Sequence, residues 1–339
     1  MSKGVGLDIG TMNLVSARMS GAKKNEVTLR RMRDLFIDLP QTAKKMLKLG
    51  SVSYIEADDT LLVLGDEAME VANMFGREGR RPLKAGLISA DEIDSLTVLG
   101  HMVKDVLGEP NHEGEHCYFS IPAAPVDANM DVVYHKGVFT RIVQECGYTA
   151  HPANEAMAIV FAETAKEGFS GIGISFGSGM TNIALAINTI EGLSFSVARG
   201  GDWIDQGASR SVGATASKMC AIKEKGIDLS APKNREEEAI SFYYKALIEH
   251  ALDNIAQQFV MKGGHLTLNK PIPIVVGGGT SLAGGFMDFF REVFETKKKR
   301  FLKNSKSSVL VSEVRHASDP LHAVSKGMLI LAQQEYDED

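Results

Sequence analysis

The sequence is poor in cysteine and has no long apolar run. Its 339 residues contain three cysteines, Cys117, Cys146 and Cys220, which are widely spaced and form no C-x-x-C pair. This pattern argues against a disulfide framework and against a zinc site, and it is typical of a reducing compartment. No apolar run approaches the length of a membrane span, and the segment MSKG before the first apolar strand is too short for a secretory signal. We therefore expect a cytoplasmic protein, and direct membrane binding has no support in the sequence.

An excess of positive charge is also absent. The formal net charge is -6, which disfavours a general affinity for nucleic acid. The strongest basic cluster is the run ETKKKRFLKNSK at residues 295–306. Because cations complement the dipole at the end of a helix, we interpret this run as a solvated helix end.

Two common nucleotide-binding motifs are missing. The lysine-bearing pattern G-x-x-x-x-G-K-[ST] does not occur, which excludes a P-loop. The glycine-rich strands read G-x-G-x-x-x-G and lead into predicted hairpins, whereas a dinucleotide site needs G-x-G-x-x-G before a helix. Any phosphate that binds here must be held in another way.

The composition is that of a globular protein with a large core. Hydrophobic residues make up 44% and charged residues 24% of a chain whose length suggests two domains or one large split fold. Strand and helix patterns alternate, which indicates an α/β fold. A helical insertion is expected between about residues 202 and 261, and the tail QQEYDED is expected to fray.

A glycine-threaded strand occurs twice. GVGLDIGTMN at residues 4–13 is matched by GIGISFGSGMTN at residues 171–182. Asn13 meets Asn182 if the second turn is two residues longer. The pattern indicates an ancient duplication. The glycine pairs with identical spacing are Gly4 with Gly171, Gly6 with Gly173 and Gly10 with Gly177.

Two facing hairpins of this kind can bind an anion. Glycines let backbone N–H groups approach a phosphate closely, and Thr11 and Ser178 can add hydroxyl donors. Asp8 stands at the end of the first strand, beside that anion. Because Mg²⁺ keeps much of its hydration shell, we expect Asp8 to hold it through water.

Five segments in one order resemble the superfamily of actin, heat-shock chaperone and sugar-kinase ATPases, and most closely the bacterial actin homologues of the MreB and MamK kind. GLDIGTMN is similar to the first phosphate loop and GISFGSGMTN to the second, while VVGGGTSLAGG is similar to the adenosine loop. NEAMAIVFA and DPLHAVSKG are similar to the two connecting helices. The segment RPLKAGLI is also MreB-like.

The resemblance implies an actin-like α/β ATPase fold, with two lobes that each have a ribonuclease-H-like core and a smaller subdomain. ATP or ADP with Mg²⁺ would bind in the cleft between them. Lobe I would comprise residues 1–155 plus 320–339, with its smaller subdomain at about 33–76. Lobe II would comprise residues 156–319, with its smaller subdomain at about 202–264.

The resemblance also assigns roles to residues. Glu155 would orient or activate the attacking water, and Asp8 would hold the metal, so these two are the expected catalytic residues. The expected cofactor-binding residues are Gly10, Thr11, Met12, Asn13, Gly177, Ser178, Gly179, Met180, Thr181, Gly201, Asp202, Gly277, Gly278, Gly279 and Thr280.

The second phosphate loop departs from the family. Its usual aspartate is Ser175, and its usual pair of threonines is Met180 and Thr181. The loss of a carboxylate predicts weaker magnesium binding or slower hydrolysis while nucleotide binding survives, with Ser175 left as a weak metal contact. Asp202 and Asp205 are candidate substitutes for that carboxylate.

Three functions fit the superfamily: a filament-forming ATPase, a small-molecule kinase and a chaperone ATPase. A chaperone would need a further substrate-binding domain, for which we expect no room, and a sugar-type kinase is the alternative. We expect a slow ATP hydrolase of the cytoskeleton that polymerises with itself into protofilaments, with adaptor proteins as further partners. It would serve cell shape, positioning or segregation.

Overall fold

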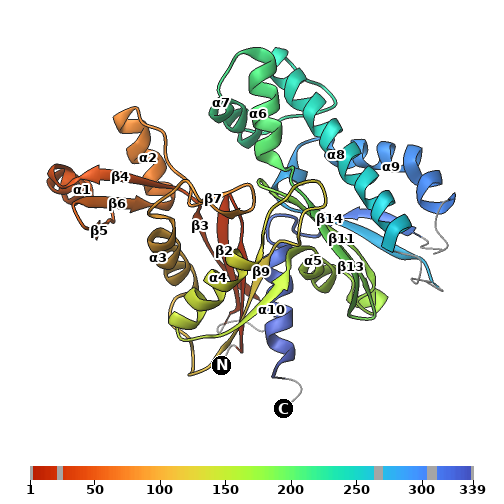
Figure 1. Ribbon diagram of the computed structural model, residues 1–339, viewed down its shortest axis with the longest axis horizontal. Coiled ribbons are helices and arrows are strands. Elements are labelled where there is room, and N and C mark those ends of the chain that lie inside the picture. Colours follow the sequence, from red (N-terminus) through yellow and green to blue (C-terminus); the bar gives the residue numbers. More distant parts are fainter. Residues whose placement is uncertain (1–2, 21–25, 263–269, 304–310, 337–339) are drawn as a thin grey trace.

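Two five-stranded mixed sheets form the frame of the protein (Figure 1). The computed structural model describes residues 3–20, 26–262, 270–303 and 311–336. The first sheet has the order β10-β9-β1-β2-β3, and its strands are β1 (Val5–Ile9), β2 (Asn13–Met19), β3 (Val27–Arg33), β9 (His116–Ile121) and β10 (Thr149–Asn154). The second sheet has the order β13-β12-β11-β14-β15, and its strands are β11 (Gly171–Phe176), β12 (Thr181–Ile187), β13 (Ile190–Val197), β14 (Ile272–Gly277) and β15 (Val311–His316).

The two sheets have the same topology. In each one, three antiparallel strands in succession are followed by two parallel strands that join on the far side of the first. This supports the predicted duplication. The predicted offset of Asn13 to Asn182 is wrong, however, because Asp8 pairs with Val15 and Ser175 pairs with Asn182. The two turns are therefore equal in length, and Asn182 corresponds to Val15.

Glycine in the strands makes room for two helices. α10 (Ala323–Gln334) packs on the first sheet, where a Cβ at Gly6 would lie 2.2 Å from the carbonyl oxygen of Ser325. α5 (Glu155–Glu163) packs on the second sheet, where a Cβ at Gly173 would lie 2.1 Å from the carbonyl oxygen of Ala156. The two helices cross at Gly327, whose Cβ would lie 1.9 Å from the backbone of Ala158. The strand glycines thus set the packing of the two helices that join the sheets.

A small subdomain extends from the first sheet, at the far left of Figure 1. Its three strands have the order β4-β6-β5, and an apolar cluster joins them to two helices. A short hairpin and two helices on the first sheet complete this half of the chain. The elements are β4 (Phe36–Pro40), η1 (Gln41–Ala43), α1 (Lys44–Leu49), β5 (Ile55–Ala57), β6 (Thr60–Leu64), α2 (Gly65–Phe75), β7 (Leu83–Lys84), β8 (Leu87–Ile88), α3 (Ser95–Leu107) and α4 (Val133–Glu145).

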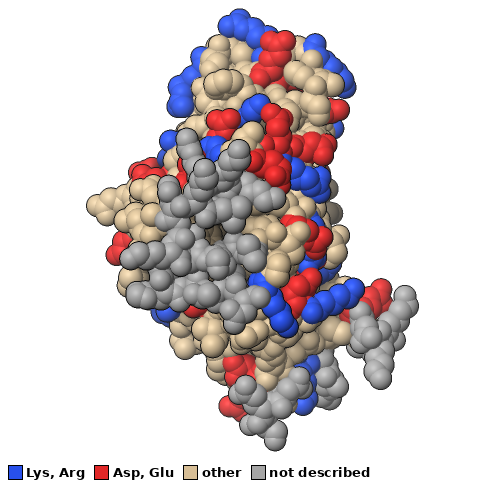
Figure 2. Space-filling view, turned by 90° about the vertical axis from the view of Figure 1, so that its right-hand side faces the viewer, with Lys and Arg blue, Asp and Glu red and all other residues tan. Residues whose placement is uncertain are grey.

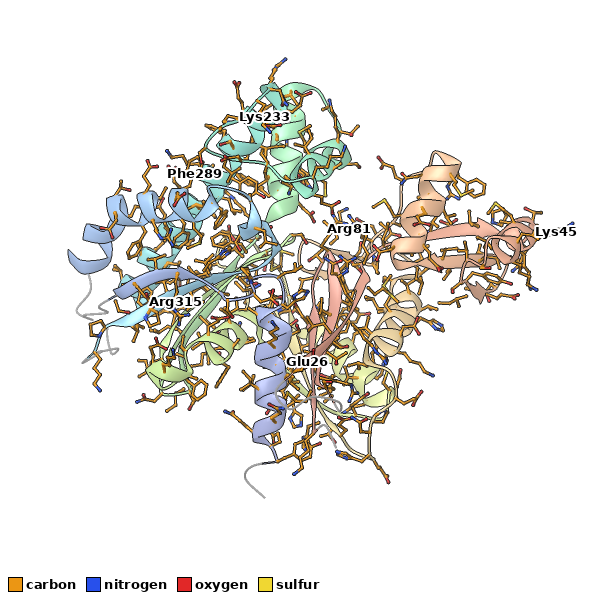
Figure 3. All side chains as sticks on the ribbon, turned by 180° about the vertical axis from the view of Figure 1, so that it is seen from behind. Glu26, Lys45, Arg81, Lys233, Phe289 and Arg315 are labelled. Atoms are coloured by element: carbon orange, nitrogen blue, oxygen red, sulfur yellow. The ribbon has the colours of Figure 1, made fainter. Side chains whose placement is uncertain are left out.

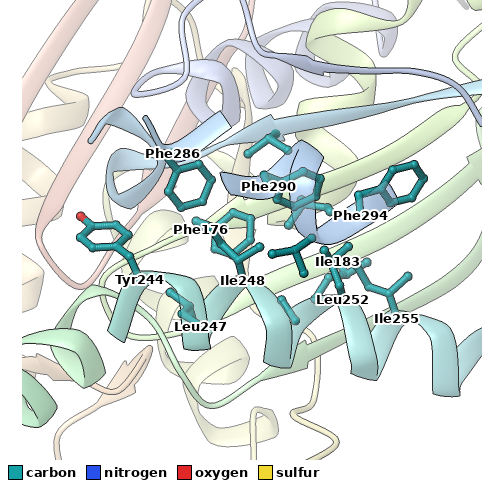
Figure 4. Packing of buried hydrophobic residues seen from close by; sticks show 14 of the residues in the cluster. Phe176, Ile183, Tyr244, Leu247, Ile248, Leu252, Ile255, Phe286, Phe290 and Phe294 are labelled. Atoms are coloured by element: carbon teal, nitrogen blue, oxygen red, sulfur yellow. The ribbon is translucent and has the colours of Figure 1, made fainter. Parts of the chain in front are cut away.

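The predicted helical insertion is present beside the second sheet. Its helices are α6 (Gly201–Val212), α7 (Ala216–Glu224) and α8 (Arg235–Lys262). α8 and α9 (Phe286–Lys303) enclose the larger core, in which the ring of Phe176 contacts those of Phe286 and Phe290 edge to face (Figure 4). Two short 3-10 turns, η2 (Ala165–Glu167) and η4 (Gly279–Leu282), complete the chain.

A segment from the first half of the chain pairs with the second sheet. Residues 123–126 run beside the end of β13, where Val126 N donates to the carbonyl of Ser196 at 2.9 Å and Ser196 N donates to Ala124 at 3.2 Å. Asp127 then accepts from Ala198 N at 2.8 Å and contacts His250 of α8 at 2.7 Å. The two halves therefore share backbone hydrogen bonds.

The C-terminal tail, which we expected to fray, is partly held in place. The tail does not fray over residues 333–336, because Tyr336 Oη accepts a hydrogen bond from His116 N at 3.1 Å and Glu335 accepts one from Tyr118. Residues 337–339, and residues 304–306 of the basic run, lie outside the described residues.

Charges of both signs are interspersed on the upper part of the face in Figure 2. No helix among the described residues is both long enough and apolar enough to cross a bilayer.

Candidate functional site

A cavity of about 620 Å³ lies between the two sheets. Its lining combines the turn after β1, the turn after β11, the end of α7, the η4 turn and the beginning of α10. A cavity of this volume fits a small organic ligand. The two glycine-threaded hairpins predicted from the sequence therefore face a common space.

The two hairpin turns have equal lengths and are closed by equivalent backbone hydrogen bonds. Gly10 N donates to the carbonyl of Asn13 at 3.1 Å, and Gly177 N donates to Met180 at 3.0 Å. In the second turn, two carbonyls accept from the first N–H groups of α6, since Gly201 N bonds Gly177 at 3.0 Å and Asp202 N bonds Ser178 at 2.8 Å. The second turn and the beginning of α6 thus form one unit.

The β7–β8 turn packs against the second hairpin turn. A Cβ at Gly179 would lie 2.1 Å from Gly86 N and 2.6 Å from Thr11 Oγ1, so only glycine allows this approach. Gly86 itself has a φ of 83°, in the left-handed region that favours glycine. The turns from the two halves therefore meet backbone to backbone.

Polar atoms without partners face the cavity region. Asn13 Oδ1 and Ser178 Oγ are buried and have no hydrogen-bond partner among the described residues. Both residues line the cavity. Buried polar atoms in native proteins normally have a partner, so these two indicate a polar ligand.

Asp8 lies on β1 and is half-buried at the cavity. Ser120 of β9 holds it, because Ser120 Oγ donates to Asp8 Oδ1 at 3.0 Å while accepting from Ile9 N at 2.7 Å. Burial raises the pKa of Asp8 to about 7, and the hydrogen bond from Ser120 opposes this rise. The carboxyl group is thus held at the cavity with little stabilisation of its charge.

Glu155 begins α5 and faces the same cavity. The helix begins here because Asn154 Oδ1 accepts from the N–H groups of Ala156 and Met157, at 2.8 and 3.1 Å. Asn182 Nδ2 donates to Glu155 Oε2 at 3.0 Å. Burial and the charge of Asp8 raise the pKa of Glu155 to about 8, and hydrogen bonds from Ser175 and Asn182 oppose the rise.

Two carboxyl groups with raised pKa values suit a divalent cation held partly through water, because a cation would relieve their repulsion. No group of three or more His, Cys, Asp and Glu side chains among the described residues could hold a metal by itself. The candidate substitutes for the missing aspartate are engaged elsewhere. Asp202 forms a bidentate pair with Arg81 at 2.9 and 3.2 Å, and Asp205 pairs with Lys223 at 2.9 Å. Glu224 is also engaged, with Arg33 at 2.6 Å. Of the carboxyl groups in the described lining, Asp8 and Glu155 are therefore the ones that would hold Mg²⁺.

Most of the predicted site residues line the cavity. They are Asp8, Gly10, Thr11, Met12, Asn13, Glu155, Ser175, Gly177, Ser178, Gly179, Met180, Gly201, Asp202, Gly278, Gly279 and Thr280. Two are absent from the lining. Thr181 is buried and donates to the carbonyl of Arg199 at 2.9 Å, and Gly277 lies within β14.

Sequence reasoning missed three residues at or beside the cavity, two of which join the two halves of the chain. Arg81 lies at the junction of the halves, where it binds Asp202 (Figure 3). Arg33 binds Glu224 of α7 at 2.6 Å. Tyr244 of α8 also lines the cavity. The MreB-like segment RPLKAGLI, which contains Arg81, was the only signal for any of these.

Solved structures of similar fold cover nearly the whole chain. One, titled "MamK double helical filament", is 21% identical, with a TM-score of 0.66 over 97% of this chain and 98% of that chain. MreB 5 of Spiroplasma citri bound to AMPPNP is 15% identical, with a TM-score of 0.64 over 98% of this chain and 97% of that one. The ethanolamine utilization protein EutJ from Carboxydothermus hydrogenoformans is 17% identical, with a TM-score of 0.54 over 97% and 90%.

These matches confirm the predicted actin-like ATPase fold and the resemblance to MreB and MamK. No curated protein sequence matches the chain significantly. A family model described as Volactin matches residues 1–332. The chain therefore belongs to the Volactin family.

Proposed function

We propose that this protein binds ATP with Mg²⁺ in the cavity, hydrolyses it slowly and polymerises into filaments of the cytoskeleton. The observation that carries the proposal is the pair Asp8 and Glu155, which face one cavity together with two hairpin turns of equal length and equivalent hydrogen bonds. Similar structures support it, since MamK is found as a double helical filament and MreB 5 is found bound to AMPPNP and to ADP.

Different residues of the cavity would bind the nucleotide and assist its hydrolysis. Backbone N–H groups of the two turns, with Thr11 and Ser178, would hold the phosphates, while η4 and α7 would hold the nucleoside. Bound Mg²⁺ would neutralise charge that develops on the transferred phosphoryl group. Glu155, whose carboxyl group faces the cavity, would accept a proton from an attacking water in its ionised form. Asn182 keeps its carboxyl group oriented.

For assembly, we assign residues 1–155 with 320–339 to one lobe and residues 156–319 to the other. A head-to-tail contact between identical subunits does not close on itself and must propagate into a filament. The small subdomain at residues 33–76 would meet the second lobe of a neighbour. Closure of the lobes on nucleotide would favour the subunit shape that fits the polymer.

The test is sedimentation and negative-stain microscopy of the full chain with ATP, with ADP and without nucleotide, in the presence of Mg²⁺. We expect pelleted filaments in ATP and a rise in melting temperature, because a ligand that binds only the folded state stabilises it. A monomer in all three states, across salt and micromolar concentrations, would contradict the filament. A melting temperature that no purine triphosphate changes would contradict nucleotide binding, and phosphorylation of an added sugar would favour the kinase alternative.

A further inference from the structure

One row of residues crosses the first sheet and faces the cavity. Asp8 of β1 pairs with Val15 of β2, and Val15 pairs with Arg31 of β3. Residues directly opposite in antiparallel strands point to the same face of a sheet. All three line the cavity. Because neighbouring strands lie about 4.8 Å apart, Arg31 begins roughly 10 Å from Asp8 along this row.

The cavity lining contains three basic residues among those described, and two of them are firmly engaged. Lys223 contacts Asp205 at 2.9 Å, with both side chains largely buried, and donates to the carbonyl of Gly201 at 2.8 Å. Arg33 contacts Glu224 at 2.6 Å. These two cations therefore already have close partners.

Arg31 is held more weakly. Its Nη2 lies 3.3 Å from Asp66 Oδ2, and the two side chains are 46% and 58% exposed. Exposed ion pairs of this kind contribute little to stability. Asp66 also lies in the first turn of α2, where a negative charge is favourable by itself. Arg31 can therefore leave Asp66 at little cost.

A triphosphate with one bound Mg²⁺ still carries net negative charge, so a further cation in the cavity would favour its binding. Its lining includes the acidic groups Asp8, Glu155, Asp202 and Glu224, and the chain has no P-loop lysine. We propose that Arg31 leaves Asp66 and binds the polyphosphate of the nucleotide. A guanidinium suits this role, because its planar donors match phosphate oxygens in pairs. The inference rests on the proposed function and adds a phosphate-binding residue to it.

Calorimetric titration of the full chain with ATP, ADP and adenosine, in the presence of Mg²⁺, tests this role. Arg31→Ala should weaken ATP binding about tenfold or more, because a hydrogen-bonded charge pair is lost, and should leave adenosine binding unchanged. Arg31→Gln, which keeps much of the side-chain length, should give the same selective loss if the alanine variant folds poorly. Asp66→Asn should tighten ATP binding, since it removes the competing partner of Arg31.

Arg30→Ala is the matched control. Arg30 is the preceding residue on β3 and lies on the other face, where its guanidinium approaches Gly108. The Arg30→Ala variant should bind ATP as tightly as the wild type does. The inference is overturned if Arg31→Ala leaves ATP binding intact, if it weakens adenosine equally, or if Asp66→Asn causes the same loss as Arg31→Ala. If the wild type binds adenosine but gains nothing from phosphates, Arg31 has no such role, and absence of all nucleotide binding overturns the proposed function itself.

Discussion

The first and second hairpins share a backbone register but carry different side chains. Across the first sheet the row is Asp8, Val15 and Arg31, whereas the row at the same register of the second sheet is Ser175, Asn182 and Ser196. The first row brings an acid and a cation to the cavity. The second brings hydroxyl and amide groups, two of which support Glu155. The duplicated frame is therefore symmetric, and the chemistry on it is not.

The helices show the same difference. Gly173 contacts the carbonyl of Ala156 in α5 as Gly6 contacts that of Ser325 in α10, so Val324 occupies the place of Glu155. Both Glu155 and Val324 line the cavity. One helix thus brings a carboxyl group to the site, and its counterpart brings an apolar side chain.

The largest effect is expected where the two halves are most alike. Gly6→Ala and Gly173→Ala should each lower the free energy of unfolding by about 3 kcal/mol, because the new Cβ would meet helix backbone that cannot move away. Denaturant titration measures this. Gly100→Ala, where a Cβ meets nothing within 4 Å inside α3, should instead stabilise by up to about 1 kcal/mol. If only one of Gly6→Ala and Gly173→Ala lowered the free energy of unfolding, the two strand–helix contacts would not be equivalent.

A smaller effect should depend on pH. The pKa of Glu155 is about 8 in the folded state against 4.5 for an ordinary glutamate, so the folded state binds more protons between these values. Stability should therefore fall as pH rises from 4.5 to 8, and Asp8, raised to about 7, adds in the same direction. Without Mg²⁺, Glu155→Gln should reduce this fall by about 1–3 kcal/mol. Val324→Gln, at the counterpart position, should leave the slope as it is; an unchanged slope in Glu155→Gln would show that Glu155 is not the titrating group.

The smallest effect tests the missing carboxylate. Ser175→Asp makes the second row more like the first and places a further acid beside Glu155. Without Mg²⁺ it should cost about 1 kcal/mol of unfolding free energy at pH 7, and with Mg²⁺ it should strengthen metal-dependent ATP binding about threefold. Melting and calorimetric titration check the two halves of this expectation. Ser175→Asn, which adds no charge, should change the unfolding free energy and the ATP affinity less than Ser175→Asp does. Equal effects of the two variants would mean that the added charge is not the cause.

Local patterns predicted the frame well. Glycine spacing and apolar strands gave both hairpins, and Asp202 fell within one residue of the beginning of the helical insertion. The predicted alignment of Asn13 with Asn182 was wrong, because it rested on the shared residue type, and the strand register rules it out. The ion pair of Arg81 with Asp202 could not be predicted, since the two residues are 121 positions apart and meet only when the two halves pack together.

The seam between residues 123–127 and β13 has a thermodynamic consequence. β13 is the edge strand of the second sheet, and its last amides bond with a segment that the first sheet holds in place. If the first sheet unfolded alone, Ser196 and Ala198 would lose these backbone partners, and His250 would lose Asp127. The free energy of unfolding of each half therefore depends on whether the other half is folded. We therefore expect the chain to melt as one cooperative unit, although its frame consists of two sheets of the same topology.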